Sequence, residues 1–399
     1  MYLTKEEEKI LSGEYGPEYQ KAMKALVKLG EAMGAERLIN IVHAHISGIS
    51  YRNIGDAGLE FIEELSKVKV KVFSTCNPAG FDLEFWKPLN IPREFFVKQL
   101  RIINALSKMG VKTTCTCTPY YVREPSFGEH LAWGESSAVL YANTVYGART
   151  NREGGPSSLF AALIGKTPYM GMHLSENRKP RVIVDAEVSI EEQAYASTLG
   201  FIIGDLAKDR IPYVKTKSSL NGKLDLVKAM CAGVGTSSPL PMCIVENVSP
   251  EAKSADLSYV EEKIHVEKYD LEKYFAKYSY SGDFDVVFLG CPHLTLDEVV
   301  SVWKFISKEK AKAKYPVFLA ISRHMYSKIP RNVLEEFMKR GIRVLRDTCL
   351  VVAPLNKMRI STVATNSIKH AYYLENIHGV KVRLCKTPEC LKLALGADS

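Results

Sequence analysis

Three cysteines in this chain occupy positions where a thiolate could bind a metal. Cys117, Cys291 and Cys349 each end or follow a run of residues that predicts a β-strand. Pro119 and Pro292 come soon after two of them, and proline ends a strand because it cannot donate to the ladder. Binding sites of open α/β sheets form outside the carboxyl ends of the strands. We therefore expect the three cysteines to converge on one metal centre.

The stretch 113–118 carries the first of these cysteines and reads as a strand that ends at Pro119. Side chains alternate between the two faces of a strand, so Cys115 and Cys117 should share a face. Cys117, at the end of the strand, is the expected ligand. Cys115, two residues earlier, should pack beneath it.

Three thiolates are compatible with more than one kind of centre. Zinc would need a fourth ligand, which His45 or His293 could supply. An iron–sulfur cluster held by three cysteines leaves one iron open, and an open iron is a Lewis acid for a substrate hydroxyl. Small buried thiols without any metal are a third interpretation. The residues alone leave these alternatives open, although the lack of a Cys-x-x-Cys pair argues against a zinc ribbon.

Two further features could bind an anion. The small-residue loop 48–50 follows an expected strand over 38–46, where backbone N–H groups could face an anion, although a turn without a ligand fits equally well. Arg149 and Arg152 lie beside a Gly-Gly-Pro-Ser helix start, and guanidinium groups grip carboxylates and phosphates. An ion pair with Glu153 is the structural alternative for these arginines.

The elements that must position these residues follow an α/β pattern. Residues 4–34 predict two helices, and residues 36–118 predict strand–helix units. From residue 283 onward, strands are expected at 284–290, 316–321, 341–345 and 381–384, with helices at 295–312 and 333–339. This alternation predicts right-handed crossovers and a parallel sheet. We expect three subdomains, at 1–125, 126–280 and 281–399.

Several local expectations bear on the candidate site. A strand over 68–73 should precede the turn at Asn77 and Pro78, and a helix should begin at Asp56. The glycine-rich stretch 232–239 lacks the spacing of a phosphate loop and is expected to be a plain loop.

The composition fits a globular enzyme and argues against several other classes. The 399 residues are 46% hydrophobic and 25% charged, which allows a large buried core. No window approaches the roughly 20 uninterrupted apolar residues of a membrane helix, and no signal-peptide core is visible, so a cytoplasmic location is expected. The net charge of +8 is spread over interspersed lysine and glutamate. The interspersed pattern argues against nucleic acid, and the modest basic excess suits an anionic small-molecule substrate.

Several runs of the sequence, taken together, resemble the aconitase X family over nearly the whole chain. They are 43–48, Asn77-Pro78, 115–120, 134–138, Asn143, 147–152, 290–293, 347–349 and 365–367. The resemblance implies an α/β fold of several parallel-sheet, three-layer subdomains of aconitase-like type around a central cleft. It also implies a hydro-lyase with an iron–sulfur cluster on Cys117, Cys291 and Cys349. We expect [4Fe–4S], with [3Fe–4S] as the alternative.

The family occurs in fused and in two-subunit forms. This chain ends at Ser399 without an appended small swivelling β-domain, so it resembles the separate large subunit, with a small subunit of that kind as its partner. The two-subunit archaeal type implies dehydration of (R)-5-phosphomevalonate to trans-anhydromevalonate 5-phosphate in isoprenoid synthesis. The alternative is dehydration of cis-3-hydroxy-L-proline, as in the fused type. The alternative from another class is a non-catalytic, zinc-stabilised protein that binds a small molecule.

Eliminating water from a β-hydroxy acid requires that the leaving hydroxide be stabilised, the acid held and a proton removed. The residues expected to hold the substrate are Gly48, Ile49, Ser50, Asn77, Pro78, Ser136, Ser137, Asn143, Thr144, Arg149, Arg152, Asn366 and Ser367. No residue of this chain stands out as the base, and the base stays open; resemblance to aconitases implies a serine, for which the small subunit is one source. His45 and His293 should support the site through hydrogen bonds without binding the metal.

Overall fold

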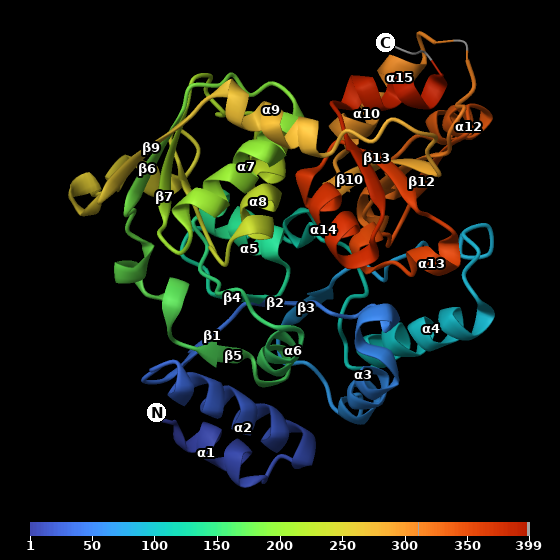
Figure 1. The fold of residues 1–399 in the computed structure, drawn as a ribbon. Coiled ribbons are helices and arrows are strands. Elements are labelled where there is room, and N and C mark those ends of the chain that lie inside the picture. The colour runs from blue at the N-terminus through green and yellow to red at the C-terminus, as the bar shows by residue number, and fades with distance from the viewer. Residues whose placement is uncertain (310, 397–399) are drawn as a thin grey trace.

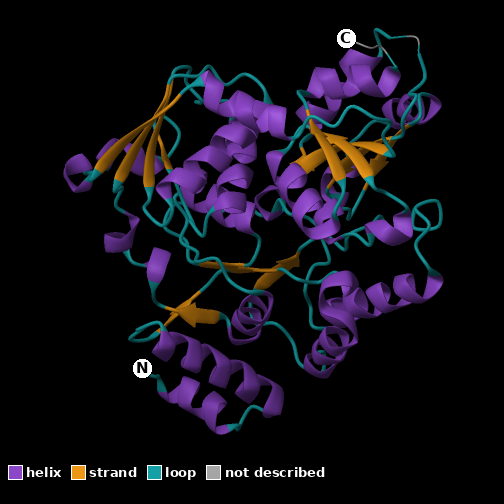
Figure 2. Ribbon diagram, viewed as in Figure 1, coloured by secondary structure: helices purple, strands orange, loops and turns teal. Residues whose placement is uncertain are grey.

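Four β-sheets carry the fold, and helices lie between and around them (Figure 1; Figure 2). The structure is a computed structural model that describes residues 1–309 and 311–396. Three of the sheets are entirely parallel, and the fourth is an antiparallel pair. This arrangement confirms the α/β class expected from the sequence. None of the described helices is long and apolar enough to cross a membrane.

The first parallel sheet lies at the centre of the molecule, between the N-terminal helices and the two larger sheets (Figure 1). Its strand order is β3 (Phe73–Cys76), β2 (His43–Ile46) and β4 (Leu131–Trp133). The helices of this part of the chain are α1 (Lys5–Ser12), α2 (Pro17–Ala32), α3 (Tyr51–Leu65), α4 (Arg93–Lys108), α5 (Ser136–Tyr141) and α6 (Gly155–Ile164). The two helices expected within 4–34 are confirmed as α1 and α2.

Two expectations for this region are wrong. The strand expected over 38–46 is split: β1 (Leu38–Asn40) pairs antiparallel with β5 (Lys166–Pro168), and only β2 joins the central sheet. Strand β3 begins at Phe73 because that residue is the first to pair with β2, so the expected strand over 68–73 does not form. Helix α3 is interrupted at Gly55, whose φ of 58° glycine adopts without strain, so the helix expected from Asp56 is confirmed as the second part of α3.

The stretch 113–118 is not a strand, which corrects the expectation from which the cysteine argument began. Lys112 forms one isolated bridge with Thr75, and the chain then leaves the sheet. The φ angle of Cys115 is 45°, in the left-handed region, so the alternation of faces does not hold. Cys115 is buried in the same hydrophobic cluster as Cys76, and Cys117 lies in the loop beyond it.

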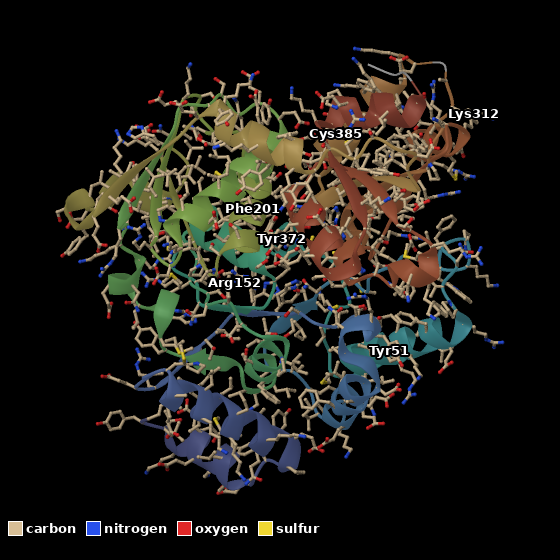
Figure 3. All side chains as sticks on the ribbon, viewed as in Figure 1. Tyr51, Arg152, Phe201, Lys312, Tyr372 and Cys385 are labelled. Carbon is tan, nitrogen blue, oxygen red and sulfur yellow. The ribbon has the colours of Figure 1, made fainter. Side chains whose placement is uncertain are left out.

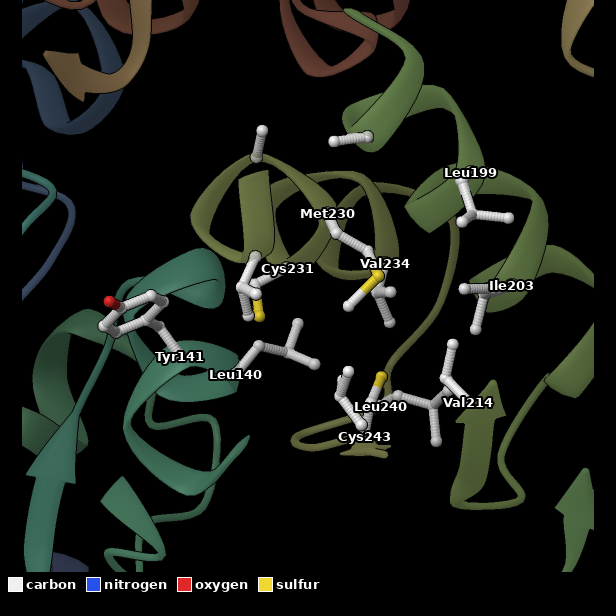
Figure 4. Close-up of a cluster of buried hydrophobic side chains, with 14 of the residues drawn as sticks. Leu140, Tyr141, Leu199, Ile203, Val214, Met230, Cys231, Val234, Leu240 and Cys243 are labelled. Atoms are coloured by element: carbon white, nitrogen blue, oxygen red, sulfur yellow. The ribbon is translucent and has the colours of Figure 1, made fainter. Parts of the chain in front are cut away.

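The second parallel sheet has the order β8 (Ile244–Val245), β7 (Pro212–Thr216), β6 (Val182–Ala186) and β9 (Glu262–Val266). The helices of this part are α7 (Gln193–Ala207), α8 (Leu224–Ser237) and α9 (Lys268–Lys277). Side chains from α5, α7, α8 and the sheet meet in one large buried cluster, to which Leu140, Leu199 and Met230 belong (Figure 4).

The glycine-rich stretch 232–239, expected to be a loop, is mostly the last part of α8. Gly233 in this stretch instead allows α8 to approach α7 closely. A Cβ atom at Gly233 would lie 2.0 Å from the carbonyl oxygen of Ser197, and one at Gly200 would lie 2.0 Å from that of Met230. Helices α7 and α8 therefore cross with their backbones in contact, which only glycine allows at these two positions.

The third parallel sheet has the order β12 (Ile342–Leu345), β11 (Val317–Ile321), β10 (Val286–Leu294), β13 (Thr362–Thr365) and β14 (Lys381–Leu384). Its helices are α10 (Leu296–Ile306), α11 (Arg323–Tyr326), α12 (Arg331–Lys339), α13 (Leu355–Met358), α14 (Ile368–His378) and α15 (Thr387–Leu395). The expected doubly wound pattern is confirmed. The chain builds outward from β10 on one side and from β13 on the other, so the strand order reverses between these two neighbours.

Three details of this sheet differ from expectation. Strand β13 was not expected at all. Strand β10 continues through Pro292 to Leu294, although its pairing with β11 is interrupted between Leu289 and Leu294. The helix expected over 295–312 ends at Ile306, and residue 310 lies outside the described residues.

Replacing Gly233 by alanine should destabilise the protein by about 1–3 kcal/mol, because the added methyl group would force α7 and α8 apart. The measurement is the thermal unfolding midpoint by calorimetry. Gly154→Ala is the matched control, since that glycine has a φ of −74° and its Cβ would come no closer than 3.7 Å to a neighbouring atom. A Gly233→Ala midpoint equal to that of the control would contradict the close helix crossing.

Candidate active site

Cys117, Cys291 and Cys349 line one pocket with a cavity of about 300 Å³. Cys117 comes from the loop after the isolated bridge at Lys112, Cys291 from β10, and Cys349 from the loop that follows β12. The structure thus brings together three residues that are far apart in the sequence. Their binding of a metal stays a prediction.

His293 connects the segments that carry these cysteines. Its backbone N–H donates to Cys117 Sγ at 3.3 Å, and its ring is hydrogen bonded to the Thr348 carbonyl oxygen at 2.8 Å and to Thr116 Oγ1 at 3.0 Å. A carbonyl only accepts, so Nε2 carries the proton and Nδ1 accepts from the Thr116 hydroxyl. Thr348 and Thr116 directly precede Cys349 and Cys117, and His293 itself follows Cys291 by two residues. One buried side chain therefore fixes the three segments relative to one another.

Burial raises the pKa of all three thiols, to about 12 for Cys291. The Lys369 ammonium lowers the pKa of Cys291 and Cys349 by a smaller amount, and the His293 N–H does so for Cys117. The thiols would therefore be protonated near neutral pH unless a cationic group binds them.

A single zinc ion is not supported by this geometry. No group of three or more histidine, cysteine, aspartate or glutamate side chains in residues 1–309 and 311–396 could hold one metal ion. Both ring nitrogens of His293 are hydrogen bonded, and those of His45 contact Thr75 and Asn77 at 2.7 and 2.8 Å. Neither histidine has a nitrogen free to act as the fourth ligand considered for zinc.

A buried ion pair forms another wall of the pocket and was missed in the sequence. Lys369 Nζ lies 2.7 Å from Glu135 Oε1 and 3.3 Å from Ser136 Oγ. Burial acts to lower the pKa of Lys369, but the Glu135 carboxylate raises it above its usual value. Burial likewise acts to raise the pKa of Glu135, and Lys369 holds it below its usual value. Both groups are therefore charged at neutral pH.

Lys369 was missed because the strand before it was missed. It lies in the first turn of α14, directly after β13 and the Asn366-Ser367 connection. This connection leaves the sheet where the strand order reverses, beside the end of β10 that carries Cys291. The short run Thr362–Thr365 between two loops was the available signal for this strand.

Most residues expected to hold the substrate line the pocket. They are Gly48, Ile49, Ser50, Asn77, Pro78, Ser136, Ser137 and Arg152. Ser50 Oγ donates to the Val352 carbonyl oxygen at 2.8 Å, which ties loop 48–50 to the segment after Cys349. Arg152 lies near the centre of the molecule in Figure 3 and donates to the carbonyl oxygens of Ser238 and Gly235.

Three residues expected to hold the substrate lie away from the pocket. Arg149 donates to the His173 carbonyl oxygen at 2.8 Å and does not line the pocket. Arg149 and Arg152 therefore do not hold one anion between them. Asn143 and Thr144 are fully buried in the middle part of the chain, where the Asn143 amide donates to the carbonyl oxygen of Thr150. These side chains stabilise the scaffold, and their positions do not bring them to a ligand in the pocket.

The last two expected residues flank the pocket. The Asn366 amide donates to Gln193 Oε1 of α7 at 2.7 Å and to Thr387 Oγ1 of α15 at 2.9 Å, so it links the second and third parts of the chain. Ser367 is buried, and its hydroxyl has no hydrogen-bond partner among the described residues. It lies beside Cys291 and lowers the pKa of that thiol, against the larger effect of burial.

Comparison with known proteins identifies the family. Models of the aconitase X first, second and third domains match residues 1–176, 180–276 and 284–396. A crystal structure described as Thermococcus kodakaraensis aconitase X in its holo form superposes with a TM-score of 0.91 at 40% identity, covering 99% of this chain and 100% of that one.

Curated relatives extend over the whole chain. The phosphomevalonate dehydratase large subunit of Methanocaldococcus jannaschii is 41% identical over 98% of this chain and 100% of that protein. The cis-3-hydroxy-L-proline dehydratase of Pseudomonas aeruginosa is 30% identical over 98% of this chain but 69% of its own, longer chain. Family models match nearly every residue, and a full-length relative is 41% identical, so the chain belongs to the aconitase X family.

Proposed function

We propose that this chain is the large subunit of a phosphomevalonate dehydratase. It would eliminate water from (R)-5-phosphomevalonate to give trans-anhydromevalonate 5-phosphate, a step of isoprenoid synthesis. The observation that carries this proposal is the pocket in which three cysteines meet a buried lysine and an arginine. Full-length relatives at 41% identity carry the same name.

Cys117, Cys291 and Cys349 would hold an iron–sulfur cluster, as [4Fe–4S] or alternatively [3Fe–4S]. Three features of the chain fit such a group. The thiols surround a cavity instead of meeting at one point, an N–H donates to Cys117 Sγ, and burial of the thiols calls for a cationic partner. When bound, a cluster held by three cysteines supplies a Lewis-acidic iron for the leaving hydroxyl group.

The chain's own residues provide the charge that an anionic substrate needs. Lys369 and Arg152 both line the pocket, and cations in a confined site bind carboxylate and phosphate strongly. Ser136 and Ser137 begin helix α5, and Asn77 adds an amide. These groups would hold the acid and orient the hydroxyl group toward the cysteines.

Glu135 does not serve as the base in this proposal. Its oxygens already accept from Lys369 Nζ, from Ser137 Oγ at 2.6 Å and from the Ala138 N–H at 2.7 Å. A carboxylate held in this way is a weak proton acceptor, since its pKa is lowered. We propose that a serine of a separate small subunit, a swivelling β-domain, removes the proton.

The proposal predicts which of two substrates the enzyme converts. The chain, co-expressed with its small subunit and purified anaerobically, should dehydrate (R)-5-phosphomevalonate and not cis-3-hydroxy-L-proline. Two pocket cations match a substrate that carries both a carboxylate and a phosphate. Product formation is followed by mass spectrometry. Turnover of cis-3-hydroxy-L-proline alone would favour that alternative activity instead.

Replacing Cys117, Cys291 or Cys349 individually by alanine should abolish iron binding, because a cluster needs all three thiolates. Metal analysis of anaerobically purified protein provides the measurement. Cys243→Ala is the control, since this cysteine is fully buried in the hydrophobic cluster of the second sheet and does not line the pocket. Equal iron content in the four variants would refute the ligand assignment.

Lys369→Met should lower kcat/KM by about 100-fold, because a buried cation next to the substrate is lost. It should also lower the unfolding midpoint, since Glu135 would remain buried without its partner. The double variant Lys369→Met/Glu135→Gln separates the two effects: stability should return, and activity should not. Recovery of activity in the double variant would show that Lys369 acts only by stabilising the fold.

A further inference from the structure

A ladder of buried side chains leads from the interior of the central sheet to the pocket. His43 Nε2 lies 2.8 Å from Thr75 Oγ1, His45 Nδ1 lies 2.7 Å from the same oxygen, and His45 Nε2 lies 2.8 Å from Asn77 Oδ1. The register of β2 with β3 creates this ladder. His45 pairs with Thr75, and His43 lies two residues away on the same face.

All members of the ladder except Asn77 are shielded from water. His43, His45 and Thr75 have no exposed surface, and Trp133 of the neighbouring strand packs edge-on against both imidazoles. Asn77, which lines the pocket, is the one member that can reach a ligand. The remaining three can act on a substrate only through it.

Thr75 Oγ1 has no hydrogen-bond partner among the described residues other than the two imidazoles, so its hydroxyl group donates to one ring and accepts from the other, and the ladder can run in only two directions. If Asn77 Oδ1 accepts from His45 Nε2–H, then His45 Nδ1 accepts from the Thr75 hydroxyl, and Thr75 Oγ1 accepts from His43 Nε2–H. If every bond is reversed, the Asn77 amide must turn so that its NH2 group donates to His45 Nε2, and His43 must carry its proton on Nδ1. His43 Nδ1 has no hydrogen-bond partner among the described residues.

The unpartnered nitrogen of His43 decides between the two directions. In the reversed ladder a buried N–H group would lack an acceptor, and such orphaned donors are rare because they cost their full desolvation. In the first direction the same nitrogen is a bare lone pair. The first direction therefore holds, and it leaves both N–H bonds of the Asn77 amide directed away from His45.

We propose that His45, Thr75 and His43 are positioning residues that hold Asn77 with its NH2 group facing the pocket, as a donor for a carboxylate or phosphate oxygen of the substrate. This inference rests on the proposed function and specifies how one side of the substrate is recognised. The ladder is electrically neutral, because burial lowers the pKa of His45 to about 4 and that of His43 well below its usual value. The direction of the bonds is thus constant around neutral pH.

Substitution of Thr75 tests the ladder without touching the pocket. Thr75→Val keeps the shape but removes the hydroxyl group that links the two histidines. KM for (R)-5-phosphomevalonate should rise about three- to tenfold with a smaller change in kcat, the effect of losing one hydrogen bond to the substrate. Thr75→Ser retains the hydroxyl group and should keep the wild-type KM. An unchanged KM in Thr75→Val, or an equal rise in Thr75→Ser, would overturn the proposal.

Ser74→Ala is the matched control for this pair. It removes a buried hydroxyl group from the adjacent residue of β3, whose Oγ donates to the Val72 carbonyl oxygen and takes no part in the ladder. Its KM should equal that of the wild type. A rise like that of Thr75→Val would mean that any loss of a buried hydroxyl in β3 disturbs the pocket, which would contradict a specific ladder.

A second measurement does not depend on activity. Nitrogen-15 NMR of histidine-labelled protein should show His43 and His45 as neutral imidazoles protonated on Nε2, with assignment by His43→Phe and His45→Phe. A proton on Nδ1 of His45 would overturn the proposal. If these tautomers are found but neither substrate is turned over, the proposed function fails while the orientation of Asn77 stands.

Discussion

The hydrogen bonds of His293 are the constraint on which the candidate site depends. Its imidazole and backbone N–H bind Cys117 and the residues that precede Cys117 and Cys349, and His293 itself lies on the strand that carries Cys291. Without such a link, the three segments would sample many relative positions. Ordering them costs conformational entropy, which these hydrogen bonds offset. Both ring nitrogens of His293 take part in these hydrogen bonds, so His293 supports the site and has no nitrogen free to bind a metal.

Charge in the pocket follows from a second constraint. A lysine removed from water is costly unless a partner of opposite charge is fixed beside it, and Glu135 is held in place by Ser137 and the N–H of Ala138. Glu135 precedes α5 and Lys369 lies in α14, so the pair forms only when the first and third parts of the chain assemble. The charged pocket thus forms only with the tertiary fold.

Much of the fold could be predicted from the sequence, and the misses have physical causes. The apolar runs of the last sheet are long and regular, so β10, β11, β12 and β14 were expected close to their positions. β13 escaped because its short run Thr362–Thr365 is half polar, and with it Lys369 escaped. The segment 113–118 has the alternation of a strand, but Cys115 turns into the left-handed region and directs Cys117 to the pocket from a loop.

The sequence by itself determined the α/β class, the family resemblance and the choice of the three cysteines that meet in the pocket. These depend on residue types, on the periodicity of apolar residues and on the order of the elements along the chain. Only the tertiary structure decided which polar residues share the pocket. It included Lys369 and Glu135, and it left Asn143, Thr144 and Arg149 in the scaffold. It also set the direction of the His43–Thr75–His45–Asn77 ladder. Hydrogen bonds and ion pairs between distant segments depend on distances of a few ångströms, and no local pattern in the sequence encodes those distances.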